Sequence, residues 1–87
     1  MENKKYLDKV VGSLVRSTKI DYDREEIHFP FSYFPFFSSL SHFHSHFTYH
    51  LFSTYCKNMF GLTDDEIEYV WKEYKDIITE KISNKES

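Results

Sequence analysis

The stretch from Ile27 to Cys56 constrains the fold most, because thirty consecutive residues there include no Asp, Glu, Lys or Arg. It holds eight of the nine Phe and all five His, together with many Ser and Thr. Such a segment is aromatic and rich in hydrogen-bonding groups at once, and its rings need large complementary surfaces. We therefore expect the charged parts of the chain to pack around it.

The number of rings is large for the size of the chain. Its 87 residues allow one small domain, and a domain of that size buries only about 60–65% of the surface of its unfolded chain. We expect a surplus of aromatic side chains at the surface, where apolar patches usually mark binding sites.

Charge and composition exclude several classes of protein. A net charge of −3, with no basic arm at either end, argues against nucleic-acid binding. Cys56, the single cysteine, excludes an internal disulfide, and no apolar signal segment follows Met1, so we expect a cytoplasmic location. The excess of Phe, Tyr, Ile, Asn and Lys over Gly, Ala, Arg and Pro is typical of AT-rich genomes, such as those of many viruses.

Hydrophobic spacing predicts a mainly α-helical domain with three helices, at about 4–17, 38–59 and 64–82. The first buries Leu7, Val10, Val11, Leu14 and Val15. The second begins after Ser38 or Ser39, ends near Gly61, and carries one apolar stripe of Leu40, Phe43, Phe47, Leu51, Tyr55 and Met59. The third opens on a capping box of Thr63 and Glu66, and its buried face is Ile67, Val70, Trp71, Tyr74, Ile77, Ile78 and Ile82.

The connection between the first two helices reads as extended chain. Apolar residues alternate on both sides of Asp23-Arg24-Glu25, which predicts a short β-hairpin within 19–29. Pro30 and Pro35 then hold an aromatic segment extended as far as residue 35, because each removes an amide donor and disfavours helix at the preceding residue.

His42, His46 and His50 are the main candidates for site chemistry. They are four residues apart, so on a helix their rings lie on successive turns, where two imidazoles can share a Zn, Ni or Cu ion. The sequence offers no obvious fourth ligand unless Asp21 or Asp23 folds beside them. The alternatives are that these rings lie at the border between core and solvent, or that their protonation loosens the helix below about pH 6.

Two further functions find less support. For catalysis, the sequence offers no phosphate loop, no nucleophile elbow and no paired carboxylates. Cys56 has Phe52 and Phe60 on its helical face, where a nucleophile would need a base. The uncharged residues 36–56 are long enough to cross a membrane, but their four His and seven Ser or Thr disfavour it.

We therefore expect a non-enzymatic interaction or assembly module, which buries a Phe- and Tyr-rich surface against itself, as a homo-oligomer, or against another protein. The contact residues should be those left over after the helical core is filled, namely Phe31, Tyr33, Phe34, Phe37, Tyr49 and Phe52. A His-rich metal-binding protein is the alternative, and a peripheral membrane-associated protein is a further one.

Overall fold

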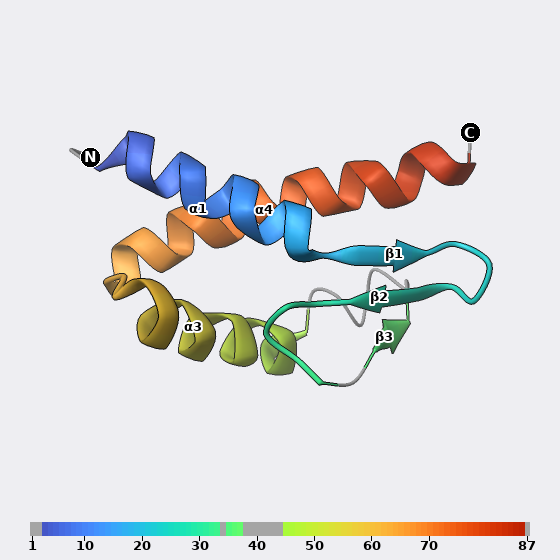
Figure 1. The fold of residues 1–87 in the computed structure, drawn as a ribbon, viewed down its shortest axis with the longest axis horizontal. Helices are drawn as coiled ribbons and strands as arrows, with labels where there is room; N and C mark the ends of the chain where they lie inside the picture. Colours follow the sequence, from blue (N-terminus) through green and yellow to red (C-terminus); the bar gives the residue numbers. More distant parts are fainter. Residues whose placement is uncertain (1–2, 34, 38–44, 87) are drawn as a thin grey trace.

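The computed structural model describes residues 3–33, 35–37 and 45–86 (Figure 1). The elements are α1 (Lys4–Ser17), β1 (Lys19–Asp21), β2 (Glu26–His28), β3 (Phe36–Phe37), α3 (His46–Phe60) and α4 (Asp64–Glu86). The predicted class is confirmed: the described chain is mainly helical, with three helices and a hairpin between the first two.

Helix α1 has the predicted bounds and packs along α4, which it crosses in Figure 1. Leu7, Val10, Val11 and Leu14 are its buried residues, as the three-and-four spacing indicated. A hydrogen bond also links the two helices at their exposed edge, where the Tyr69 hydroxyl donates to Asp8 Oδ1 over 2.9 Å. Docking of the apolar face stabilises α1, whose three Val and one Gly are weak helix formers.

The hairpin forms where the alternation predicted it. Strands β1 and β2 are antiparallel, and Ile20 lies opposite Ile27. Asp21 stabilises the turn, since its Oδ1 accepts the Arg24 backbone N–H over 3.1 Å. Glu25 then takes a left-handed conformation, with φ of 57°, and leads the chain into β2.

A third strand extends this hairpin, which sequence patterning did not predict. β3 pairs antiparallel with β2, with Phe36 opposite Ile27 and Phe37 opposite Glu26, and the strand order is β1-β2-β3. Extended chain was predicted as far as residue 35, but Pro30 and Phe31 form a turn, in which the Ser32 N–H donates to the Phe29 carbonyl over 3.4 Å. The pairing of β3 with β2 was not predicted. Proline has no N–H for a ladder, so the pairing begins just after it.

Aromatic rings from three parts of the chain meet in the core. Phe31 stacks on Phe29 at a centroid distance of 4.7 Å and meets Phe52 of α3 edge-on at 5.4 Å. Phe52 in turn lies 4.8 Å from Trp71 and 5.5 Å from Tyr74, both on α4. This aromatic cluster fixes how the connection, α3 and α4 sit together.

Helix α3 begins later than expected. Ser45 is its N-cap: its backbone is extended, with ψ of 156°, and its side chain accepts the Thr48 N–H over 3.2 Å. The helix therefore starts at His46 rather than near residue 38, and the proposed N-caps Ser38 and Ser39 lie outside the described residues. Gly61 ends the helix with φ of 64°, as predicted.

The face that α3 turns to the core also differs from the prediction. Thr48, Phe52 and Cys56 are its fully buried residues, whereas Phe47 and Met59, from the expected stripe, are 64% and 62% exposed. Counting apolar residues selected the wrong side of the helix, because the contacts of the Phe52 ring with Phe31, Trp71 and Tyr74 decide its rotation.

Helix α4 confirms the capping box. The Thr63 N–H donates to Glu66 Oε1 over 2.9 Å, and the Glu66 N–H donates to Thr63 Oγ1 over 3.3 Å. The predicted buried face is also confirmed, with Trp71 and Ile77 half-buried at its edges. The helix continues to Glu86, beyond the predicted end near 82.

Two alanine substitutions on α3 test which side of the helix is buried. We expect Phe52→Ala to lower the free energy of unfolding by about 3–5 kcal/mol, because it empties the centre of the aromatic cluster. Phe47→Ala should change it by less than about 0.5 kcal/mol, since that ring is mostly exposed. Urea unfolding measures both values. Equal losses would contradict an α3 that buries Phe52 and exposes Phe47.

Candidate functional site

One flank of α3, between its buried and its solvent-facing sides, carries a row of large apolar side chains. Phe47, Leu51, Tyr55 and Met59 follow one another at intervals of four residues, and we call them the α3 stripe. Phe47 and Met59 at its two ends are exposed, and the two residues between them are half-buried. Tyr55 connects the stripe to the core, because its ring lies 6.3 Å from Phe31 and 6.0 Å from Phe60.

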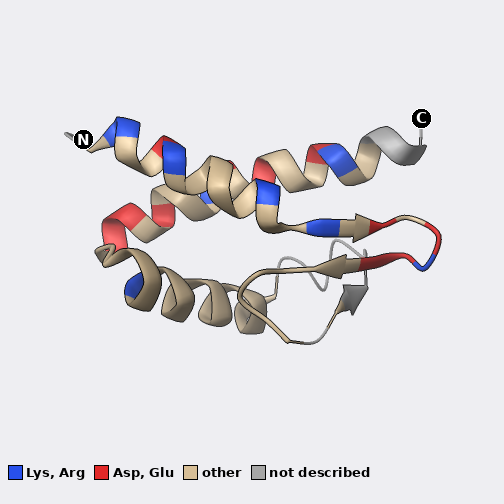
Figure 2. Ribbon diagram, viewed as in Figure 1, with Lys and Arg blue, Asp and Glu red and all other residues tan. Residues whose placement is uncertain are grey.

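Charge is almost absent around this stripe. Helix α3 contains neither Asp nor Glu, and Lys57 is its one Lys or Arg. That ammonium group lies 2.9 Å from Asp64 Oδ1, at the start of the next helix. Figure 2 shows the contrast with α1 and α4, which carry bands of both signs, while α3 is uncharged over nearly its whole length. Most surface helices place charged residues on their solvent side, so α3 is unusual.

The six predicted contact residues fall into three groups. Tyr33 is fully exposed, and Tyr49 is half-buried with its ring 5.5 Å from Trp71. Phe34 lies outside the described residues, and for Phe37 the structure describes only the backbone, as part of β3.

Phe31 and Phe52 form the third group, and for them the expectation of leftover rings is wrong. Both belong to the buried core, and Phe52 has no exposed surface. The turn at Pro30–Phe31 places Phe31 against α3, so a small domain encloses more rings than three helices alone would. Phe47 and Met59 were missed as surface residues because the predicted stripe was assigned to the core.

The histidines are only partly described. His46 and His50 are exposed on α3, one turn apart, whereas His42 lies outside the described residues. Within residues 3–33, 35–37 and 45–86, no group of three or more His, Cys, Asp or Glu is placed to hold a metal ion. Metal binding by His42, His46 and His50 stays a prediction.

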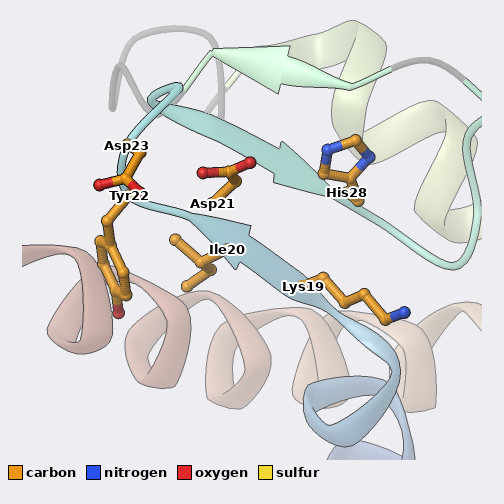
Figure 3. Close-up of a pocket in the computed structure, with 6 residues that line it drawn as sticks. All are labelled: Lys19, Ile20, Asp21, Tyr22, Asp23 and His28. Carbon is orange, nitrogen blue, oxygen red and sulfur yellow. The ribbon is translucent and has the colours of Figure 1, made fainter.

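A hollow of about 570 Å³ lies on the hairpin and was not anticipated (Figure 3). Its lining residues are Lys19, Ile20, Asp21, Tyr22, Asp23 and His28. Lys19 and His28 lie toward one end and the two carboxylates toward the other, while the Tyr22 hydroxyl donates to the Lys81 carbonyl of α4 over 3.3 Å. Asp21 is engaged by Arg24 in the turn, and His28 Nε2 lies 3.3 Å from Glu26 Oε2. These contacts stabilise the hairpin and its attachment to α4.

Cys56 was expected to be a small buried hydrophobe, and it is buried. Burial raises the pKa of its thiol to about 12. Burial likewise raises the pKa of the Tyr74 phenol, although its hydrogen bond with the Thr18 hydroxyl acts in the opposite direction. A protonated, enclosed thiol is a poor nucleophile at neutral pH.

The uncharged segment 36–56 also raised the question of a membrane span. Helix α3 occupies only its second half and has 15 residues in all. Over the described ranges of the chain, none of the helices combines the length and the apolar character that crossing a membrane requires.

Alkaline unfolding tests the environment of Cys56. Below about pH 9 the thiol is protonated in both states, so its contribution to stability is complete; above that, the unfolded chain releases a proton that the folded chain keeps up to about pH 12. We expect the free energy of unfolding to fall between these values, by up to about 1.4 kcal/mol per pH unit from this group.

The control for this measurement is Cys56→Ala, compared by urea unfolding across the same pH range. The free energy of unfolding of this variant should be lower at neutral pH, because a buried sulfur is lost. It should also fall less steeply as the pH rises, because one titrating group is gone. Parallel curves would contradict a raised thiol pKa.

Comparisons of the chain with protein-family models, with curated proteins and with solved structures found no match. The side chains themselves are therefore the guide to function. The α3 stripe, with the exposed Tyr33 on the connection, is the described surface that departs most from an ordinary solvated one.

Proposed function

We propose that the chain is a non-enzymatic protein-interaction module and that the α3 stripe is its contact surface. The observation that carries this proposal is the exposure of two large apolar side chains on α3. The helix turns Thr48, Phe52 and Cys56 inward and leaves the more apolar Phe47 and Met59 exposed.

The composition of this surface is that of an interface centre. Aromatic residues and Met are enriched at the centres of protein interfaces, and charged residues are depleted there. An exposed Phe and an exposed Met gain more from a partner's pocket than from water, since burying a large apolar side chain contributes about 1.5–3 kcal/mol. Tyr33 adds a further ring, two residues beyond the Phe31 that touches α3.

The half-buried members of the stripe give this surface a rigid base. Leu51 and Tyr55 pack against the core, so the helix presents its exposed side chains from a fixed backbone. Preorganised side chains lose less conformational freedom on binding, which favours affinity. The polar neighbours His50, Thr54 and Asn58 are exposed beside the stripe and supply a hydrogen-bonding rim.

Site-specific photo-cross-linking in cells that produce the protein tests the proposal. A photoreactive phenylalanine analogue at position 47 should give one discrete cross-linked species. The same analogue at Asp76, which is exposed on the charged side of α4, is the matched control and should give none.

The adduct should also disappear when Met59→Asp is added, because a carboxylate at the other end of the stripe leaves an unpaired charge in the contact. An adduct that survives this change, or equal cross-linking from positions 47 and 76, would contradict the proposal. Circular dichroism of each variant verifies that the fold is retained.

A further inference from the structure

We infer that the partner is a second copy of this chain, which docks its α3 against α3 of the first in an antiparallel, two-fold symmetric pair. This inference rests on the proposed function and names its partner. A two-fold contact uses the same patch on both copies, so the patch must be complementary to itself. Spacing and charge on α3 both meet that requirement.

The spacing of the stripe is symmetric about Ser53. A two-fold axis at that position brings Phe47 of one copy against Met59 of the other, and Leu51 against Tyr55. Both exposed ends are thereby covered at once, and each thioether meets an aromatic ring, a favourable contact. Residues four apart form a continuous ridge, and two such ridges interdigitate when helices cross at about 50°, the commonest packing of helices in globular proteins.

The near absence of charge on α3 favours the same partner. A strongly basic or acidic partner would find no counter-charges on α3, whereas a second copy matches its uncharged surface. The Lys57 ammonium group is paired with Asp64 over 2.9 Å, so it brings no unpaired charge to the contact.

Analytical ultracentrifugation of the purified protein from micromolar to millimolar concentration tests the inference. We expect a reversible monomer–dimer equilibrium. Phe47→Asp and Met59→Lys, each alone, should raise the dissociation constant at least about tenfold, because each places a charge against an apolar side chain of the second copy.

The double variant Phe47→Asp, Met59→Lys is the decisive test of the antiparallel contact. Within one copy these positions lie about 18 Å apart along the helix, so the two introduced charges do not pair. Across the antiparallel contact the carboxylate at position 47 of each copy meets the ammonium group at position 59 of the other, so the double variant should recover most of the lost affinity. Lys72→Glu, on the exposed charged side of α4, changes the net charge by more and should leave the dissociation constant unchanged.

A wild-type protein that stays monomeric at millimolar concentration would overturn the inference. So would single variants that dimerise normally, or a double variant that stays as weak as the singles. Thermal melts monitor folding, and both sites are more than half exposed, so the charges should be tolerated. A monomer whose position 47 still cross-links to a different protein would remove the second copy as partner and leave the interaction function standing.

Discussion

The contact of the Phe52 ring with Phe31, Trp71 and Tyr74 is the interaction on which the rest of the molecule depends. It joins the connection between β2 and β3, α3 and α4 at one point. Aromatic pairs of this kind add about 0.5–1.5 kcal/mol each beyond the burial of their area. Among the described residues, α3 makes one ion pair with α4, Lys57 with Asp64 at the turn between the two helices. Along the rest of α3, the ring cluster is the main contact that sets its position.

The rotation that suits Phe52 determines which residues α3 exposes. A helix can turn only one side toward a core, and α3 has apolar residues on more than one side. With Phe52 and Cys56 inward, Phe47 is carried to the surface, and Leu51 and Tyr55 reach only the edge of the core. Met59 lies three residues beyond Cys56 and is exposed at the end of the helix. The same geometric choice therefore gives this small domain a well-packed interior and an apolar exterior strip.

Signals contained within a single segment were predictable. The bounds of α1, the Thr63–Glu66 capping box, the Gly61 end of α3 and the buried face of α4 all follow from local spacing and capping chemistry. The start of α3 at His46 was missed, although Ser45 and Thr48 form a local cap, because Ser38 and Ser39 compete for the same role in the sequence.

Features that depend on distant contacts were not predictable in this way. The pairing of β3 with β2 joins residues that share no local pattern, and Phe31 reaches the core only because the connection folds back over α3. The exposed stripe was missed for the same reason. Periodicity identifies which residues of a helix share a side, but not which side meets the rest of the protein.

The position of Trp71 has an experimental consequence. It is the single Trp of the chain, half-buried on α4, and its indole lies against Phe52 and Tyr49 of α3. Its intrinsic fluorescence therefore reports on one junction, between α3 and α4, while far-ultraviolet circular dichroism averages over every helix. A fluorescence emission that shifts before the ellipticity falls would identify a state in which α3 has separated from α4 while the helices are still formed. The native chain therefore carries its own optical probe of this helix contact.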